Sequence, residues 1–334
     1  MCGTQTRNPH LRRSIKKCLQ VGLCEYCVVK LVNDNKDSDQ ITLLSFGGSR
    51  RHTLMMKYVS VWSNISNGSN KSSNYNEWIP VTDNHNNPII IGRAEMHYYH
   101  GMRAVVGGSN NHLLFITYYL NHISVFDLNT FQFIKHDNLP ADNHVHHHCF
   151  VSNSANGHGQ EMMKTNKQNY QMLLFYQNTG LSIEYDEDNN TFQFHQLLVC
   201  DDIAKLSNYA YVCVNDIILF FGGWNDDKCV FSKSVHKYSI KEKKWTKFEN
   251  TLPGPLCHCT AVLNKNSTYI HIIGGQNKNS ILSTHMKTEV HVWDPSQLSK
   301  KEIKFAIQYW IRISEIKLGW IDDFDKIVMK YIRT

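Results

Sequence analysis

The stretch from Tyr209 to Pro253 decides the fold. It reads YAYVCVNDIILFFGGWNDDKCVFSKSVHKYSIKEKKWTKFENTLP, and four short strands are expected in it, at the apolar-rich Tyr209–Val214, the continuously apolar Ile217–Phe221, Val235–Ile240 and Trp245–Phe248. Turn-forming or charged residues separate the runs, and Gly222-Gly223 ends the second of them. Short strands joined by turns pair antiparallel, and a run that is apolar on both faces is buried on both faces. The stretch therefore predicts a four-stranded antiparallel sheet.

The same order of strands recurs along the chain. Five copies are predicted, over residues 25–82, 101–141, 146–201, 207–253 and 257–294. Two middle copies share the tetrapeptide Thr-Phe-Gln-Phe, at residues 130–133 and 191–194. The third strand is expected at Tyr58–Trp62 in the first copy, where Glu77-Trp78 would begin the fourth, and at Glu289–Asp294 in the last, which shows no fourth strand. Repetition at this spacing predicts propeller blades or solenoid units.

Paired glycines close the second strand in three of the copies: Gly47-Gly48, Gly222-Gly223 and Gly274-Gly275. Glycine fits a blade rim, where the chain leaves the sheet with positive backbone angles or against another backbone. Aromatic side chains such as Tyr238 and Trp245 are expected to fill the gap between neighbouring blades. These glycines and aromatics are predicted to be structural.

The order Phe220–Gly223, Tyr238, Trp245 and Leu252-Pro253 resembles the kelch repeat. Ile272–Gly275 with Trp293 matches the first part of the same pattern, and the resemblance extends loosely over residues 25–294. It implies an all-β, kelch-type β-propeller with about five visible blades, or a six-bladed one that lacks a blade. It also implies a platform that binds partner proteins through the loops between strands.

The charge distribution argues against a nucleic-acid partner. The net charge is +6, but residues 1–24 carry five basic side chains and no acidic one, and residues 295–334 carry eight basic and five acidic ones, which leaves −2 for residues 25–294. The lysines of residues 241–247 are interpreted as a solvated turn rather than a binding patch. No apolar run reaches the roughly 18 residues of a membrane span.

The two ends differ from the body. Residues 1–24 form a basic arm, and the spacing of Leu11, Ile15 and Leu19 leaves mitochondrial targeting open beside the expected cytoplasmic location. Residues 295–334 show apolar spacing of three and four, which predicts a short helical tail. That tail either packs on the edge of the propeller or mediates oligomerisation through residues 300–334.

No metal, cofactor or catalytic residue is assigned. The ten cysteines form no disulfide framework and are interpreted as reduced thiols. Two weaker metal hypotheses remain: zinc held by Cys24, Cys27 and the Cys257-His258-Cys259 triplet, and a metal clip of His144, His146 and His148 on one strand face. The alternative for each is an ordinary core or solvent-facing position.

The predicted function is a non-catalytic protein-interaction or scaffold module. Copper oxidases of galactose-oxidase type share the kelch-like propeller and are the alternative from another class, but no spacing of Tyr, Cys and His singles out their site. A substrate adaptor for a ubiquitin ligase is a further alternative by analogy.

Overall fold

The structure is a computed structural model that describes residues 26–32, 40–48, 52–59, 76–92, 98–99, 101–153, 169–264, 266–278 and 280–293. The predicted basic arm (1–24) and helical tail (295–334) lie outside the described residues. The chain divides into two compact units, which are treated separately. One unit holds the described residues up to Thr260 together with Ile273–Thr284, and the other holds Ala261–Ile272 and the residues from His285 onward.

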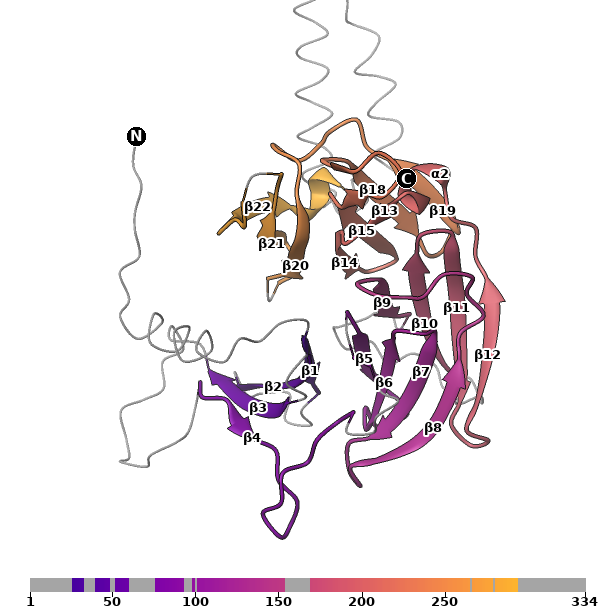
Figure 1. Ribbon diagram of the computed structural model, residues 1–334, viewed down its shortest axis with the longest axis vertical. Helices are drawn as coiled ribbons and strands as arrows, with labels where there is room; N and C mark the ends of the chain where they lie inside the picture. Colours follow the sequence, from indigo (N-terminus) through magenta and orange to yellow (C-terminus); the bar gives the residue numbers. More distant parts are fainter. Residues whose placement is uncertain are drawn as a thin grey trace, which may run out of the picture. The chain divides into compact units, whose positions relative to one another are not determined.

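Four antiparallel sheets of four strands follow one another in the first unit (Figure 1). The first two sheets are β1 (Tyr26–Leu31), β2 (Gln40–Gly47), β3 (His52–Val59) and β4 (Ile79–Pro80), then β5 (Arg103–Gly107), β6 (Leu113–Tyr118), β7 (His122–Asp127) and β8 (Gln132–Asn138). The next two are β9 (Cys149–Ser152), β10 (Asn169–Tyr176), β11 (Thr179–Asp186) and β12 (Thr191–Gln196), then β14 (Ala210–Val214), β15 (Ile217–Phe221), β18 (Val235–Ser239) and β19 (Lys244–Lys247). Each sheet keeps its strands in chain order, as a propeller blade does.

The fifth copy forms a sheet of three strands. These are β20 (Cys257–Leu263), β21 (Tyr269–Gln276) and β22 (His285–Glu289), in that order. The prediction of a strand at Glu289–Asp294 is wrong, because a short 3-10 helix (η1, Val290–Val292) follows β22. The Trp293 amide donates to the Val290 carbonyl at 3.0 Å, and the Trp293 indole donates to Thr288 Oγ1 at 3.0 Å. These bonds curl the chain where an extended strand was expected.

The first copy also differs from its prediction. Its third strand, β3, lies at His52–Val59 instead of Tyr58–Trp62, and its fourth, β4, is Ile79–Pro80 rather than a strand beginning at Glu77-Trp78. β3 pairs with β2 over eight residues, from His52 opposite Gly47 to Val59 opposite Gln40. To pair along the whole of β2, β3 must begin soon after the glycine pair. Its sequence, His-Thr-Leu-Met-Met-Lys, shows little alternation of apolar and polar residues, so the sequence alone did not indicate a strand here.

The hydrophobic core lies between consecutive sheets. Phe46 of β2 packs with Leu114 and Ile116 of β6, and Phe115 packs with Tyr185 of β11 in the next cluster. A third cluster joins the β9–β12 sheet to the β14–β19 sheet, and its aromatic members are Phe175, Tyr209, Phe220 and Tyr238. Because each cluster is built from two neighbouring sheets, the sheets stack as blades. The predicted all-β propeller fold is confirmed.

A small sheet lies beside the fourth blade and was not predicted. It consists of β13 (Leu206–Ser207), β16 (Trp224–Asn225) and β17 (Val230–Phe231), in the order β13-β16-β17. A short helix, α2 (Asp201–Ala204), precedes β13. β16 and β17 form the hairpin that follows Gly222-Gly223, in the segment that the sequence presented only as a polar loop.

Candidate functional site

One end of the blades is formed by two kinds of loop. In a four-stranded up-and-down sheet, the turn between the second and third strands lies at the same end as the connections to the neighbouring sheets. Asn121, in the β6–β7 turn, fastens these loops together. Its carbonyl accepts the Leu139 amide at 2.6 Å, its Oδ1 accepts the Val145 amide at 3.0 Å, and its Nδ2 donates to the Ala141 carbonyl at 2.7 Å. We call this end of the first unit the loop end.

The rings of Tyr98, Tyr119 and His144 form an aromatic patch at the loop end, and we include in it Leu120, which follows Tyr119 in the same turn. The ring centroids of Tyr98 and Tyr119 are 5.5 Å apart, and those of Tyr119 and His144 are 5.1 Å apart. Tyr98 is 55% exposed and Leu120 is 47% exposed. Leu120 also has a φ of 67°, in the left-handed region that a leucine rarely adopts.

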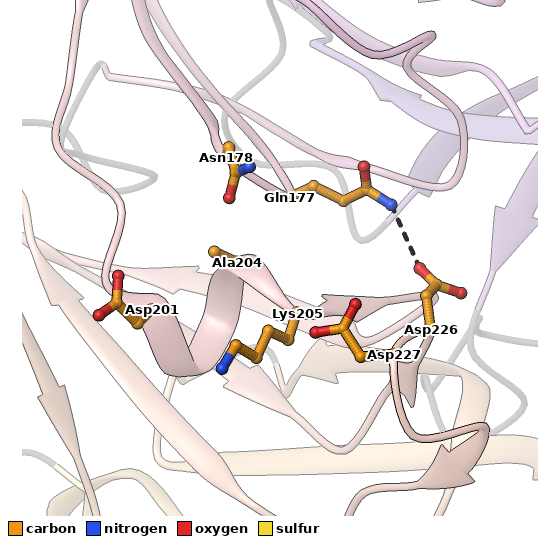
Figure 2. Close-up of a pocket in the computed structure, with 7 residues that line it drawn as sticks. All are labelled: Gln177, Asn178, Asp201, Ala204, Lys205, Asp226 and Asp227. Atoms are coloured by element: carbon orange, nitrogen blue, oxygen red, sulfur yellow. Dashed lines mark hydrogen bonds between the residues drawn. The ribbon is translucent and has the colours of Figure 1, made fainter.

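Beside the aromatic patch lies a polar cavity of about 310 Å³ (Figure 2). The residues that line it are Gln177, Asn178, Asp201, Ala204, Lys205, Asp226 and Asp227. They come from three places: the β10–β11 turn, α2 with the residue after it, and the turn of the β16–β17 hairpin. Gln177 Nε2 donates to Asp226 Oδ2 at 3.2 Å, which links the first of these to the third (Figure 2). We call it the acidic cavity.

Asn143 connects the acidic cavity to the aromatic patch. Its Nδ2 donates to Gln177 Oε1 at 2.9 Å, and its neighbour along the chain is His144 of the aromatic patch. The contacts therefore continue from Tyr98 through His144 and Gln177 to Asp226. The aromatic patch and the acidic cavity make one surface, which we call the loop-end surface.

The carboxylates near the cavity differ in their partners. Asp202, outside the cavity lining, pairs with Lys247 at 2.8 Å, and the hydrogen bond from Lys247 lowers the pKa of the Asp202 carboxyl. Among the described residues, Asp201, Asp226 and Asp227 form no such ion pair. Burial, and then the charge of Asp226, raise the pKa of Tyr176 to about 12, so this phenol stays protonated. Its hydroxyl lies 3.0 Å from His146 Nδ1.

The three histidines of the predicted metal clip do not converge. His144 packs on Tyr119, and His146 contacts Tyr176. His148 is buried against Thr117, with 2.6 Å between His148 Nε2 and Thr117 Oγ1, and burial is the main cause that lowers the pKa of its imidazole well below the usual value. The segment 144–148 is irregular rather than a strand, so alternate residues do not share a face.

The cysteine and histidine residues proposed for zinc are not gathered either. Cys257 and Cys259 are buried while His258 between them is exposed, and burial raises the pKa of both thiols to about 11. Cys27 is buried in the core between the first two sheets, and Cys24 lies outside the described residues. In the part of the chain that the structure describes, there is no group of three or more His, Cys, Asp or Glu side chains that could hold a metal ion.

The glycines predicted as structural all have positive φ angles: Gly47, Gly48, Gly222, Gly223, Gly274 and Gly275. Tyr238 and Trp245 lie 5.0 Å apart by ring centroid, and both pack on Phe175 of the preceding sheet, at 4.7 and 5.1 Å. Trp293 belongs to the second unit and is 5% exposed. None of these residues lines the acidic cavity.

Gly222 and Gly223 nevertheless position one wall of that cavity. They lead from β15 directly into the hairpin that carries Asp226 and Asp227, and the Gly223 carbonyl accepts the Ser232 amide at 2.8 Å where the hairpin returns. Sequence reasoning missed the two aspartates as site residues. The available signal was the polar run Asn-Asp-Asp-Lys that follows the glycine pair.

Comparison with known proteins identifies the repeat. Residues 205–250 match the kelch motif, which confirms the kelch repeat predicted in that part of the chain. No curated protein matches the sequence. No helix among the described residues is long and apolar enough to cross a membrane.

Two of the many similar solved structures illustrate the likeness. The YjhT structure has 13% sequence identity to this chain, and the alignment covers 78% of this chain and 83% of the YjhT chain, with a TM-score of 0.46. The structure of the RRP9 WD40 repeats has 11% sequence identity to this chain, and the alignment covers 74% of this chain and 56% of the RRP9 chain, with a TM-score of 0.39.

Proposed function

We propose that this kelch-repeat β-propeller is a non-catalytic protein-interaction module that binds a partner through its loop-end surface. The observation that carries the proposal is the continuity of the aromatic patch with the acidic cavity, through Asn143 and Gln177. Binding energy at protein interfaces concentrates in large anchor side chains beside pockets, inside a more polar surround. The loop-end surface has both parts.

The backbone at Leu120 supports the same proposal. A leucine with φ of 67° costs about 1–2 kcal/mol relative to an ordinary backbone angle, and its side chain remains 47% exposed. Among the described residues, Leu120 belongs to none of the hydrophobic clusters that pack between the sheets. Strained residues of this kind concentrate at ligand-binding sites. Contact with a partner would bury the Leu120 side chain.

A matched pair of variants tests the proposal. Phe131 is also an exposed apolar residue with positive φ, but it lies in the β7–β8 turn, at the other end of β7. Leu120→Asn and Phe131→Asn therefore remove similar side chains from opposite ends of one blade, and asparagine tolerates both backbone angles.

The measurement is affinity purification from cell lysate followed by quantitative mass spectrometry of the captured proteins. We expect a set of proteins that wild type and Phe131→Asn both recover and that Leu120→Asn loses. If Leu120→Asn recovers the same proteins in the same amounts as wild type, the loop end is not the binding surface.

A further inference from the structure

The charge of the loop-end surface is uneven. Three carboxylates line the acidic cavity against one ammonium group, that of Lys205. Asp202 nearby has its own cation in Lys247, whereas Asp226 accepts one amide hydrogen bond, from Gln177, and Asp227 accepts none from the described residues. Both Asp226 and Asp227 are exposed, on a hairpin turn.

We infer that the partner presents a basic segment, with a Lys or Arg side chain in the acidic cavity and a neighbouring apolar residue on the aromatic patch. This inference rests on the proposed function and adds the chemistry of the partner. The apolar anchor is provided by Tyr98, Tyr119 and Leu120, and the opposite charge by Asp226 and Asp227. Either feature alone would fit many occupants, but their continuity selects a segment that carries both kinds of side chain.

The geometry of the cavity fits a cationic side chain. Its volume of about 310 Å³ is at the small end of ligand pockets, enough for one long side chain and its remaining water. A guanidinium group donates two parallel hydrogen bonds to a carboxylate, so adjacent Asp226 and Asp227 suit arginine in particular. An acidic segment would meet three carboxylates and only Lys205.

The charge at this site sets specificity more than affinity. Exposed ion pairs are weak individually and are screened by salt, whereas complementary charge speeds association and rejects partners of the wrong sign. The apolar contact with the aromatic patch therefore supplies most of the affinity, and the acidic cavity selects the sequence that is bound. Loss of the carboxylates of Asp226 and Asp227 should therefore change which peptides bind, without abolishing binding.

Selection from a random peptide library displayed on phage tests this inference on the full chain. The chain is immobilised as wild type, as Asp226→Asn/Asp227→Asn, and as Asp188→Asn, a control that removes a carboxylate from the exposed β11–β12 turn, at the other end of β11. We expect Arg and Lys to be enriched in peptides selected on wild type and on Asp188→Asn, and not in those selected on the double variant. Equal melting temperatures of the three proteins establish that the folds are intact.

The outcomes separate this inference from the proposed function. Selected peptides rich in aromatic residues but without Arg or Lys, or rich in Asp and Glu, overturn the basic partner and leave the interaction module standing. No enrichment on wild type beyond bare beads counts against both. If Arg and Lys are equally enriched on the double variant, another site binds the basic side chains of the peptides, and the inference is overturned.

Fluorescence anisotropy with one selected, labelled peptide gives the magnitude. We expect the double variant to weaken binding about tenfold, since two half-solvated ion pairs are lost. We also expect wild-type binding to weaken as NaCl rises from about 50 to about 300 mM, and the double variant to respond less. Equal salt dependence in the two proteins would overturn the role given to Asp226 and Asp227.

Discussion

Gly222→Ala should destabilise the fold much more than Gly274→Ala. Both glycines stand in the same place in their repeats and have nearly the same φ, +66° and +71°. A Cβ at Gly222 would lie 2.1 Å from the Leu256 carbonyl oxygen, whereas a Cβ at Gly274 has nothing within 4 Å. The pair therefore separates the backbone-angle cost from the steric cost of one methyl group.

The expected magnitudes follow from these contacts. The positive φ costs an alanine about 1 kcal/mol at either position. At Gly222 the Leu256 carbonyl must also move, and this carbonyl accepts the Gly223 amide at 2.8 Å. Loss of that hydrogen bond and the accompanying shift add about 2 kcal/mol. We expect about 3 kcal/mol of destabilisation for Gly222→Ala and about 1 kcal/mol for Gly274→Ala.

Thermal unfolding followed by calorimetry measures the difference. For a chain of this size, 1 kcal/mol corresponds to a change in Tm of about 2–4 °C, so Gly222→Ala should lower Tm by about 6–12 °C. Gly274→Asn is the control and should lie close to wild type, because asparagine tolerates this backbone angle. Equal losses of Tm for the two alanine variants would refute the steric argument, since only the shared φ would then matter.

Three further variants test the packing, the buried histidine and the strained turn. Phe175→Ala should cost about 3–5 kcal/mol, because Phe175 is buried between the third and fourth sheets; urea unfolding checks this against Phe131→Ala, which should cost less than about 1 kcal/mol. Burial lowers the pKa of His236 to about 4, so its contribution to stability is complete above pH 6.5 and is lost as the pH falls toward 4. His236→Phe should therefore lose about 2 kcal/mol less than wild type between pH 7 and pH 5 in urea unfolding, and an unchanged difference would contradict the assignment. Leu120→Asn should raise stability by about 1 kcal/mol in the same assay while it weakens partner binding; a loss of stability would show that Leu120 is not strained.

The fourth blade could be predicted from the sequence almost residue by residue. The expected strands 209–214, 217–221, 235–240 and 245–248 correspond to β14, β15, β18 and β19, and every end lies within one residue of its prediction. The continuous apolar run explains this success, because five residues that end at a glycine pair are too few for a buried helix and suit a strand buried on both faces. The glycine pair then fixed where that strand ends.

Other strands were misplaced because their own residues carry a weak signal. β3 reads His-Thr-Leu-Met-Met-Lys, with neither strict alternation nor a continuous apolar run, and its position follows from pairing with β2. At the other end of the chain, Glu289–Asp294 alternates like a strand, yet hydrogen bonds to Val290 and Thr288 turn it into a 3-10 helix. Tertiary contacts outweighed the local pattern in both cases.

The acidic cavity could not be read from the sequence at all. Gln177, Asp201 and Asp226 are separated by 24 and 25 positions, and no motif spacing connects them. They meet because two blades and the hairpin after Gly223 bring three loops to one end. The left-handed backbone of Leu120 is equally hidden, since leucine is an unusual choice for that angle.

Apart from Leu120, stability and binding therefore depend on different residues, with one exception. The aromatic rings between sheets stabilise the blades without lining the loop-end surface, and Asp226 and Asp227 line that surface without packing in the core. The exception is the glycine pair. The Gly223 amide donates to the carbonyl of Leu256, just before β20, and the Gly223 carbonyl accepts the amide of Ser232, where the hairpin returns. A substitution at Gly222 that displaces the Leu256 carbonyl should move the hairpin and with it one wall of the acidic cavity. Gly222→Ala should then bind peptide more weakly than wild type even at temperatures well below its Tm, where it is folded. Phe175→Ala lowers stability by at least as much, but it should bind peptide as wild type does at temperatures where it is folded.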